Sequence, residues 1–346
     1  MDHIRPFVAA DDEAYTQLLR TSPDTGLVQF AREFQCPPSA ALPALHHDAH
    51  TAVAVNEQAQ LSGTGTVSFS TLRVHDQLLP SAYLSALAVH PAHRHRGVAR
   101  TLAAWRFQVA QERLGDTSVV YALIQQGNEG SLRTARTWQP EVLGRVVVAP
   151  VPVRTRPVPA RAGLRVRSVT PDDWPEVAAG LKAFNAAFAL APETTALELS
   201  QWQAERLMGY PWRHYLVVTD DLGTILAGVG MTELARHSVL RVSAMPLALR
   251  WLNAAVRVVP PDGALRLLQV EKAFVLPGQE AAGQYLMQSA RWLWRDLGSH
   301  LSVTFDPRGP LAQMYALPRW LPTTELRVAL RAPGHLAEDA LVHPDA

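Results

Sequence analysis

Apolar residues recur along the first 150 residues at two different spacings. Alternating or continuous apolar and β-branched stretches predict strands, at residues 4–7, 51–55, 63–74, 81–89, 118–124 and 142–149. Apolar residues three and four positions apart predict helices, at residues 11–20, 27–34, 97–114 and 128–138. The predicted order is β-α-α-β-β-β-α-β-α-β, an α/β arrangement.

The second half of the chain repeats this order. Residues 164–167 correspond to the first strand, 4–7, and Thr170 caps the helix that follows. Two strands, 214–219 and 224–232, flank a turn at 220–223. A strand at 264–276 and a helix at 285–297 come next. A helix at 246–259 departs from the repeat, and either packs against the other half or is an ordinary core helix. We expect domains at 1–150 and 164–331, an extended proline-rich linker at 151–163, and a loose tail at 332–346.

The stretch from Leu87 to Leu102 joins an apolar strand to a helix through a basic turn. Pro91 ends the strand because proline lacks the ladder donor. Gly97 opens the helix, whose first turn has free N–H groups and the positive end of the helix dipole. These groups, with Arg94 and Arg96 beside them, predict an anion site that suits a phosphate.

The spacing of Val89, Pro91, Arg94, Gly97 and Ala99 resembles the acetyl-CoA pyrophosphate loop of the GNAT superfamily of N-acetyltransferases. The alternative is a basic turn that merely solvates its charges. The resemblance implies a mixed sheet in tandem GNAT folds, with an intact acetyl-CoA loop in the first. Acetyl-CoA would be the co-substrate, and no metal is implied.

Carried onto this sequence, the family motif assigns the co-substrate's contacts. Backbone groups of Leu87, Ala88 and Val89 would hold the pantetheine arm and polarise the thioester carbonyl. The diphosphate would lie on the turn and the first helical residues, which are Arg94, His95, Arg96, Gly97, Val98, Ala99 and Arg100. Asn128 and Ser131 match the family's N-x-x-[S/A] motif beside the CoA arm. Asn128 is equally suited to be a helix N-cap.

The catalytic acid and base are not assigned by the motif. Where the family often has a tyrosine acid, this chain has Ala135. The strand before the loop offers only Tyr83 and Ser85, and a strand tyrosine more often packs than reacts. In the second half Glu271 lies in the strand before the second loop, and Tyr315 lies where a family acid might sit. Either the second half faces the first and supplies walls of the substrate site, or Glu271 forms a surface ion pair with Lys272 or an arginine.

The second loop, 277–283, differs from the first at two decisive positions. Aligning Pro277 with Pro91 places Glu280 on Arg94 and Tyr285 on Ala99. A carboxylate repels a diphosphate, and a tyrosine crowds the approach of the backbone. We expect a degenerate second copy, an architecture that resembles mycothiol synthase; the first half also resembles the enhanced-intracellular-survival type of acetyltransferase.

Composition limits the remaining possibilities. The formal net charge of +1 argues against non-specific nucleic-acid binding. Cys36 is the single cysteine, no Cys/His spacing resembles a zinc site, and the chain has neither a signal-peptide core nor a long apolar run. These features predict a cytoplasmic protein without membrane or nucleic-acid partners, as a monomer or homodimer.

The leading hypothesis is acetyl transfer from acetyl-CoA to a primary amine, favouring a small molecule, by direct attack on the thioester. The alternative is a non-catalytic CoA-binding or interaction protein, since acid and base are missing. Aminoacyl-tRNA-dependent transfer would dispense with the loop, so the intact loop argues against it.

Overall fold

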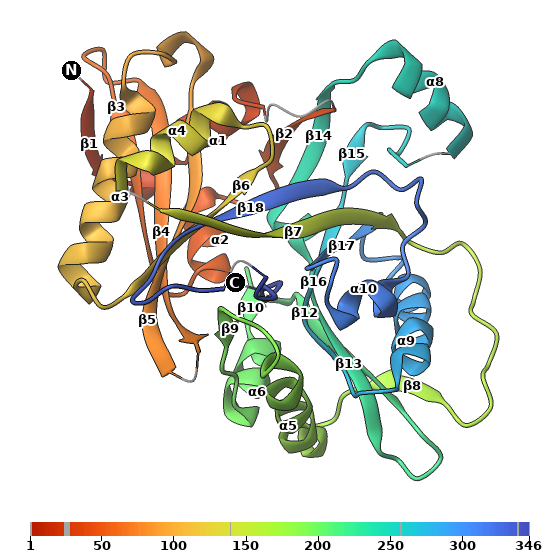
Figure 1. The fold of residues 1–346 in the computed structure, drawn as a ribbon. Coiled ribbons are helices and arrows are strands. Elements are labelled where there is room, and N and C mark those ends of the chain that lie inside the picture. Colours follow the sequence, from red (N-terminus) through yellow and green to blue (C-terminus); the bar gives the residue numbers. More distant parts are fainter. Residues whose placement is uncertain are drawn as a thin grey trace.

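The computed structural model describes residues 2–23, 28–75, 77–138, 140–256, 258–337 and 339–345, with the side chains of 252 and 254–256 excepted (Figure 1). Asp76, between the strands predicted at 63–74 and 81–89, lies outside these ranges. The first half contains β1 His3–Pro6, α1 Asp12–Thr21, β2 Gln29–Phe34, α2 Pro38–Leu45, β3 Ala49–Val55, β4 Leu61–Val74, β5 Gln77–Val89, α3 Val98–Leu114, β6 Val119–Gln125, α4 Glu129–Ala135 and β7 Glu141–Pro152.

The second half repeats much of this order, with additional short elements. It contains β8 Arg165–Ser168, α5 Trp174–Asn185, β9 Ala191–Pro192, α6 Ala196–Ala204, β10 Arg206–Leu207, β11 Tyr210–Pro211, β12 Arg213–Thr219, β13 Ile225–Thr232, α7 Leu234–His237, β14 Ser238–Ala244, α8 Leu247–Val256, β15 Ala264–Leu265, β16 Leu267–Val275, α9 Glu280–Leu293, β17 His300–Phe305, α10 Pro310–Tyr315 and β18 Thr324–Arg331.

One large mixed sheet runs through both halves, in the order β1-β3-β4-β5-β6-β18-β7-β17-β16-β13-β12-β8. The parallel pairs are β5 with β6 and β16 with β17. The last strands of the two halves are exchanged: β18 pairs with β6 of the first half, and β7 pairs with β17 of the second (Figure 1). The halves therefore share one hydrogen-bonded sheet instead of lying as separate domains on a linker.

The helix predicted over 27–34 is wrong. Residues 29–34 form strand β2, which pairs antiparallel with β14 of the second half from Phe34–Ser238 to Gln29–Ala244; Leu27 lies outside the described residues. Phe30 and Phe34 suit a strand, and pairing with a distant partner overrides the local helical spacing. The seam between β2 and β14, extended by β15, is a second, small sheet that joins the halves.

The segment after β18 is packed, in contrast to the expected loose tail. Leu336, Val342 and His343 are almost completely buried, and Val342 forms a bridge with Ala189. Figure 1 shows the C-terminus in the middle of the molecule, between the halves. The chain end is thus part of the core that joins them.

Two further segments differ from expectation. The start of the expected linker belongs to β7, which extends to Pro152. The inserted helix is α8, but Leu247 and Trp251 on it are 72% and 79% exposed, so these side chains pack neither in the core nor on the other half. It stands away from the large sheet in Figure 1.

Candidate active site

Strand β5 carries a bulge near the C-terminal end of its pairing with β4. The register shifts between Thr64 and Thr66, and Ala86 opposite them adopts a positive φ of 50°. A bulge leaves backbone groups unpaired and bends the strand. Beyond it, Leu87 and Val89 pack toward α3.

Strands β5 and β6 separate at the same place. Their parallel pairing covers only Ser81–Tyr83 opposite Val119–Tyr121. From Leu84 to Val89 no pairing with β6 is present in the described ladder, although β5 continues to Val89. An opening between two parallel strands, lined by backbone groups, is therefore built next to the bulge.

The turn after β5 leads directly to a free helix N-terminus. His95 and Gly97 adopt positive φ angles of 64° and 87°, and Gly97 is the N-cap of α3 without a side-chain cap. Thr101 donates the first helical hydrogen bond to the Gly97 carbonyl, so the N–H groups of residues 98–100 have no acceptor within the helix. A Cβ at Gly97 would meet nothing within 4 Å, so the space over this turn is open.

The predicted loop side chains divide into two groups. Val98 is buried in a cluster with Ala54 and Leu102, and only its backbone can serve a ligand. The basic residues are exposed, and they are Arg94, His95, Arg96 and Arg100. Arg94 donates through Nε to the Val89 carbonyl at 3.3 Å, which ties the loop to the end of β5.

Asn128 is the N-cap of α4, and its Oδ1 accepts a hydrogen bond from the Ser131 N–H at 3.0 Å. Asn128 therefore caps the helix, as one of the two interpretations expected. It leaves the Asn128 amide nitrogen available. Both residues follow β6, whereas the basic loop follows β5, so the two predicted groups flank the opening from its two strands.

Tyr83 and Ser85 lie on the face of β5 opposite α3. Their neighbours Ala82 and Leu84 pack toward α3, whereas Tyr83 stacks on Tyr121 at a ring distance of 4.9 Å. Burial raises the pKa of Tyr83, so the phenol stays protonated at neutral pH. Ser85 Oγ is buried without a hydrogen-bond partner, which makes it a free polar group at the bulge.

Arg106 is a site residue that the sequence reasoning missed. Its side chain is 5% exposed, and Nη1 donates to the Ser85 carbonyl at 2.9 Å. Burial lowers its pKa to about 10, so it remains charged at neutral pH. The signal was present, because Arg106 follows Leu102 by four residues on the buried face of α3. Its hydrogen bond to the Ser85 carbonyl holds the bulge from the α3 side of the sheet.

The second half contains the same backbone device. Lys272 precedes Pro277 by five residues, as Ala86 precedes Pro91, and Lys272 also has a positive φ, 52°, next to a register shift in β13 between Gly228 and Gly230. Strands β16 and β17 pair only at Leu267–Gln269 opposite His300–Ser302. Bulge and strand separation are thus repeated.

Side chains of α10 pack against the start of α9 and against β17. Met314 of α10 is fully buried, and a Cβ at Gly283 would lie 2.9 Å from its Cγ. Tyr315 is buried against Phe305 at a ring distance of 5.6 Å, which makes it a core residue. Glu280 accepts a hydrogen bond from the Gly278 N–H at 3.3 Å, so a carboxylate of the chain already lies on this loop.

Glu271 and Asp345 bring carboxylates to the junction of the halves. Glu271 accepts a hydrogen bond from Thr232, and burial raises its pKa. Asp345 accepts from the Lys272 N–H at 2.8 Å, and burial also raises its pKa. Asp345 acts electrostatically on Tyr121 of the first half. The surface ion pair that was one interpretation of Glu271 is not its environment. Asp345 was missed because its segment read as a tail.

Residues 15–137 match the model of the acetyltransferase (GNAT) family. This segment of the first half is therefore similar to that family, and the similarity supports an acyltransferase. No curated protein matches the chain by sequence. None of the helices in the described ranges is long and apolar enough to cross a membrane.

Several solved structures share the fold over nearly the whole chain. N-myristoyltransferase of Saccharomyces cerevisiae with bound myristoyl-CoA is 13% identical with a TM-score of 0.63, over 98% of this chain and 86% of that one. A GCN5-related N-acetyltransferase from Sphaerobacter thermophilus is 17% identical with a TM-score of 0.58, over 97% and 98%. A tandem GNAT protein from the clavulanic acid biosynthesis pathway is 14% identical with a TM-score of 0.58, over 97% and 100%. The predicted mixed α/β fold is confirmed by these similarities.

Proposed function

We propose that the chain transfers an acetyl group from acetyl-CoA to the primary amine of a small molecule, within the first half. The observation that carries this proposal is the set of free N–H groups at the start of α3, beside the opening between β5 and β6. A diphosphate fits the N-terminus of a helix next to Arg94 and Arg96. The open space over Gly97 admits it.

The other contacts of acetyl-CoA are assigned along the opening between β5 and β6. The pantetheine arm lies along Leu87, Ala88 and Val89, with Asn128 and Ser131 on the opposite side. The amine nitrogen attacks the thioester carbonyl carbon, the C–S bond breaks, and the proton lost by the amine balances the thiolate that leaves. Tyr83 and Ser85 are the hydroxyl groups nearest to this reaction along β5, and both remain protonated donors.

The test combines binding and turnover in the same samples. Acetyl-CoA that binds the native state must raise the Tm, by an amount equivalent to about 2.7 kcal/mol at a hundredfold excess over Kd. Thiol release is then followed with a panel of primary amines. In Gly97→Glu we expect both signals to be lost, because a carboxylate and a Cβ enter the anion site.

Each outcome separates the hypotheses. A Tm shift with thiol release supports the proposed enzyme, and a Tm shift without turnover favours the CoA-binding alternative. The absence of a shift overturns the proposal. Acyl-CoA thioesters from acetyl to myristoyl form a further arm, since myristoyl-CoA is bound in the yeast structure; a marked preference for the longer chains would replace acetyl in the proposal.

A further inference from the structure

Arg32 on β2 is a cation without an opposite charge at the seam between the halves. Its Nη1 donates to Ser238 Oγ at 3.0 Å, and burial lowers its pKa. Within the described residues no carboxylate lies at ion-pair distance from it. On the same two strands, Arg241 is paired with Glu33 at 2.8 Å. Arg32 is half-buried, and a partly desolvated guanidinium is costly unless an anion compensates it.

Two imidazoles complete this cluster. His237 Nδ1 lies 2.8 Å from the same Ser238 Oγ, and both His46 and His237 are within the electrostatic field of Arg32. His237 is 1% exposed, and its Nε2 has no hydrogen-bond partner. A buried, unused imidazole nitrogen next to an unpaired guanidinium is a rare arrangement, because buried polar atoms are normally satisfied.

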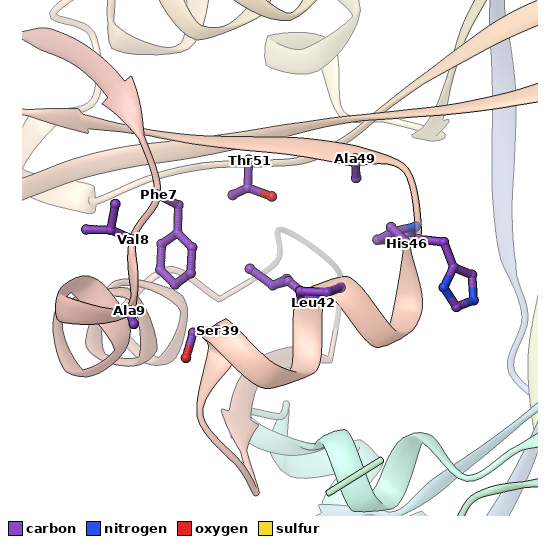
Figure 2. Close-up of a pocket in the computed structure, with 10 residues that line it drawn as sticks. Phe7, Val8, Ala9, Ser39, Leu42, His46, Ala49 and Thr51 are labelled. Atoms are coloured by element: carbon purple, nitrogen blue, oxygen red, sulfur yellow. The ribbon is translucent and has the colours of Figure 1, made fainter. Parts of the chain in front are cut away.

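One member of the cluster, His46, also lines a pocket of about 320 Å³. Figure 2 shows this pocket between α2 and β3, with Ser39 and Leu42 from the helix, His46 directly after the helix, and Thr51 from the strand. The Thr51 hydroxyl lies 2.9 Å from that of Thr66. Thr66 is paired with Ser85 on β5. The pocket thus opens onto the face of the sheet where Ser85 lies.

A second route leads from Arg32 to the thioester position. Tyr15 lies within the electrostatic field of Arg32, and its hydroxyl interacts with Thr64. Thr64 is paired with Ala88, one of the residues assigned to the pantetheine arm. Through Tyr15 and through the pocket at His46, the cluster is linked to β4, the strand that pairs with β5.

We propose that Arg32, with His46 and His237, binds an anionic group of the acceptor, so that the acceptor amine also carries a carboxylate or a phosphate. This inference rests on the proposed acetyl transfer and names its substrate class. A planar guanidinium binds either anion through two parallel hydrogen bonds. The unused His237 nitrogen can supply a further one once it carries the hydrogen.

The experiment compares amines that differ only in the anion: glycine with glycinamide, and phosphoethanolamine with ethanolamine. Acetyl-CoA is kept saturating, so that the loop at Gly97 is occupied. We expect Arg32→Gln to lower kcat/KM for the anionic amines about tenfold or more, because charge-assisted hydrogen bonds are lost, and to leave the neutral amines within about twofold. Arg32→Lys keeps the charge and should restore part of the loss. Arg319→Gln, on an exposed side chain, is the matched control.

The Tm shift with acetyl-CoA reports whether each variant is folded and whether its CoA site is intact. If the shift persists and Arg32→Gln lowers acetylation of anionic and neutral amines equally, the anion subsite is overturned while the acetyltransferase stands. The same holds if wild type prefers the neutral amines. Loss of the acetyl-CoA shift in wild type would instead overturn the proposed function itself. The two amine pairs distinguish a carboxylate from a phosphate.

Discussion

The turns before α3 and α9 both have open space above a glycine, Gly97 and Gly278, but only the second turn carries a carboxylate of the chain, Glu280, which accepts a hydrogen bond from the Gly278 N–H. The backbones agree closely: Ala86 and Lys272 both have positive φ beside a register shift. The side chains differ, since Met314 packs against Gly283 and Glu280 lies on the loop.

The bulge and the separation of parallel strands are therefore properties of the fold, and they do not by themselves make a ligand site. Access decides whether they can bind a ligand. The first half leaves the N–H groups of residues 98–100 and Ser85 Oγ without partners, whereas in the second half the buried Met314 of α10 packs against Gly283 at the start of α9. We infer that the second half serves as a scaffold.

The largest contrast is expected between Gly97→Glu and Gly278→Glu. Both glycines have positive φ, 87° and 77°, and open space at the Cβ position, so backbone strain of about 1–2 kcal/mol is common to both variants. Only Gly97→Glu should abolish the Tm shift with acetyl-CoA and lower turnover more than about a hundredfold. Loss of the shift in Gly278→Glu as well would mean that the second loop takes part in binding.

Met314→Ala removes the side chain that packs against Gly283 in the first turn of α9. Truncating a fully buried methionine costs about 2–5 kcal/mol, and urea unfolding should show this loss. Calorimetry should still give one acetyl-CoA per chain, because Glu280 remains on the loop. Met208→Ala, at a side chain that is 58% exposed, should change stability by less than about 0.5 kcal/mol. A second bound acetyl-CoA in Met314→Ala would contradict the view that the second loop is disabled.

The sequence allowed the first loop to be predicted because its chemistry is local. Arg94 and Gly97 sit at fixed distances from a strand end and a helix start, and Asn128 has the position of an N-cap; each signal needs only a few neighbouring residues. The repeat of the elements in the second half was visible for the same reason.

The parts that were missed depend on pairing between distant segments. The helix expected at 27–34 is strand β2 because β14, some two hundred residues away, pairs with it. Asp345 reaches the junction of the halves only through the packing of Val342 and His343. Arg32 could not be recognised as unpaired, since that property belongs to the seam and not to its neighbours in sequence.

A smaller effect distinguishes the strands that follow the two openings. His300 occupies the pair position in β17 that Val119 occupies in β6, and burial lowers the pKa of His300 to about 4. In the unfolded chain a histidine titrates near 6.5, so its contribution to stability is complete above pH 6.5 and is lost as the pH falls toward 4. Between these values each such histidine adds a slope of about 1.4 kcal/mol per pH unit.

His300→Val copies the first half into the second and should remove this slope, whatever it does to stability at pH 7. The measurement is the free energy of unfolding from pH 7 to pH 4 for wild type and variant. Some slope should remain, because His237 and His343 are also buried with pKa values of about 3. His3→Val, at an exposed position of β1, should leave the slope unchanged. If His300→Val also left the pH slope of the unfolding free energy unchanged, the His300 imidazole would be protonated or solvated in the folded protein. Strands β6 and β17 would then not differ in how they respond to pH.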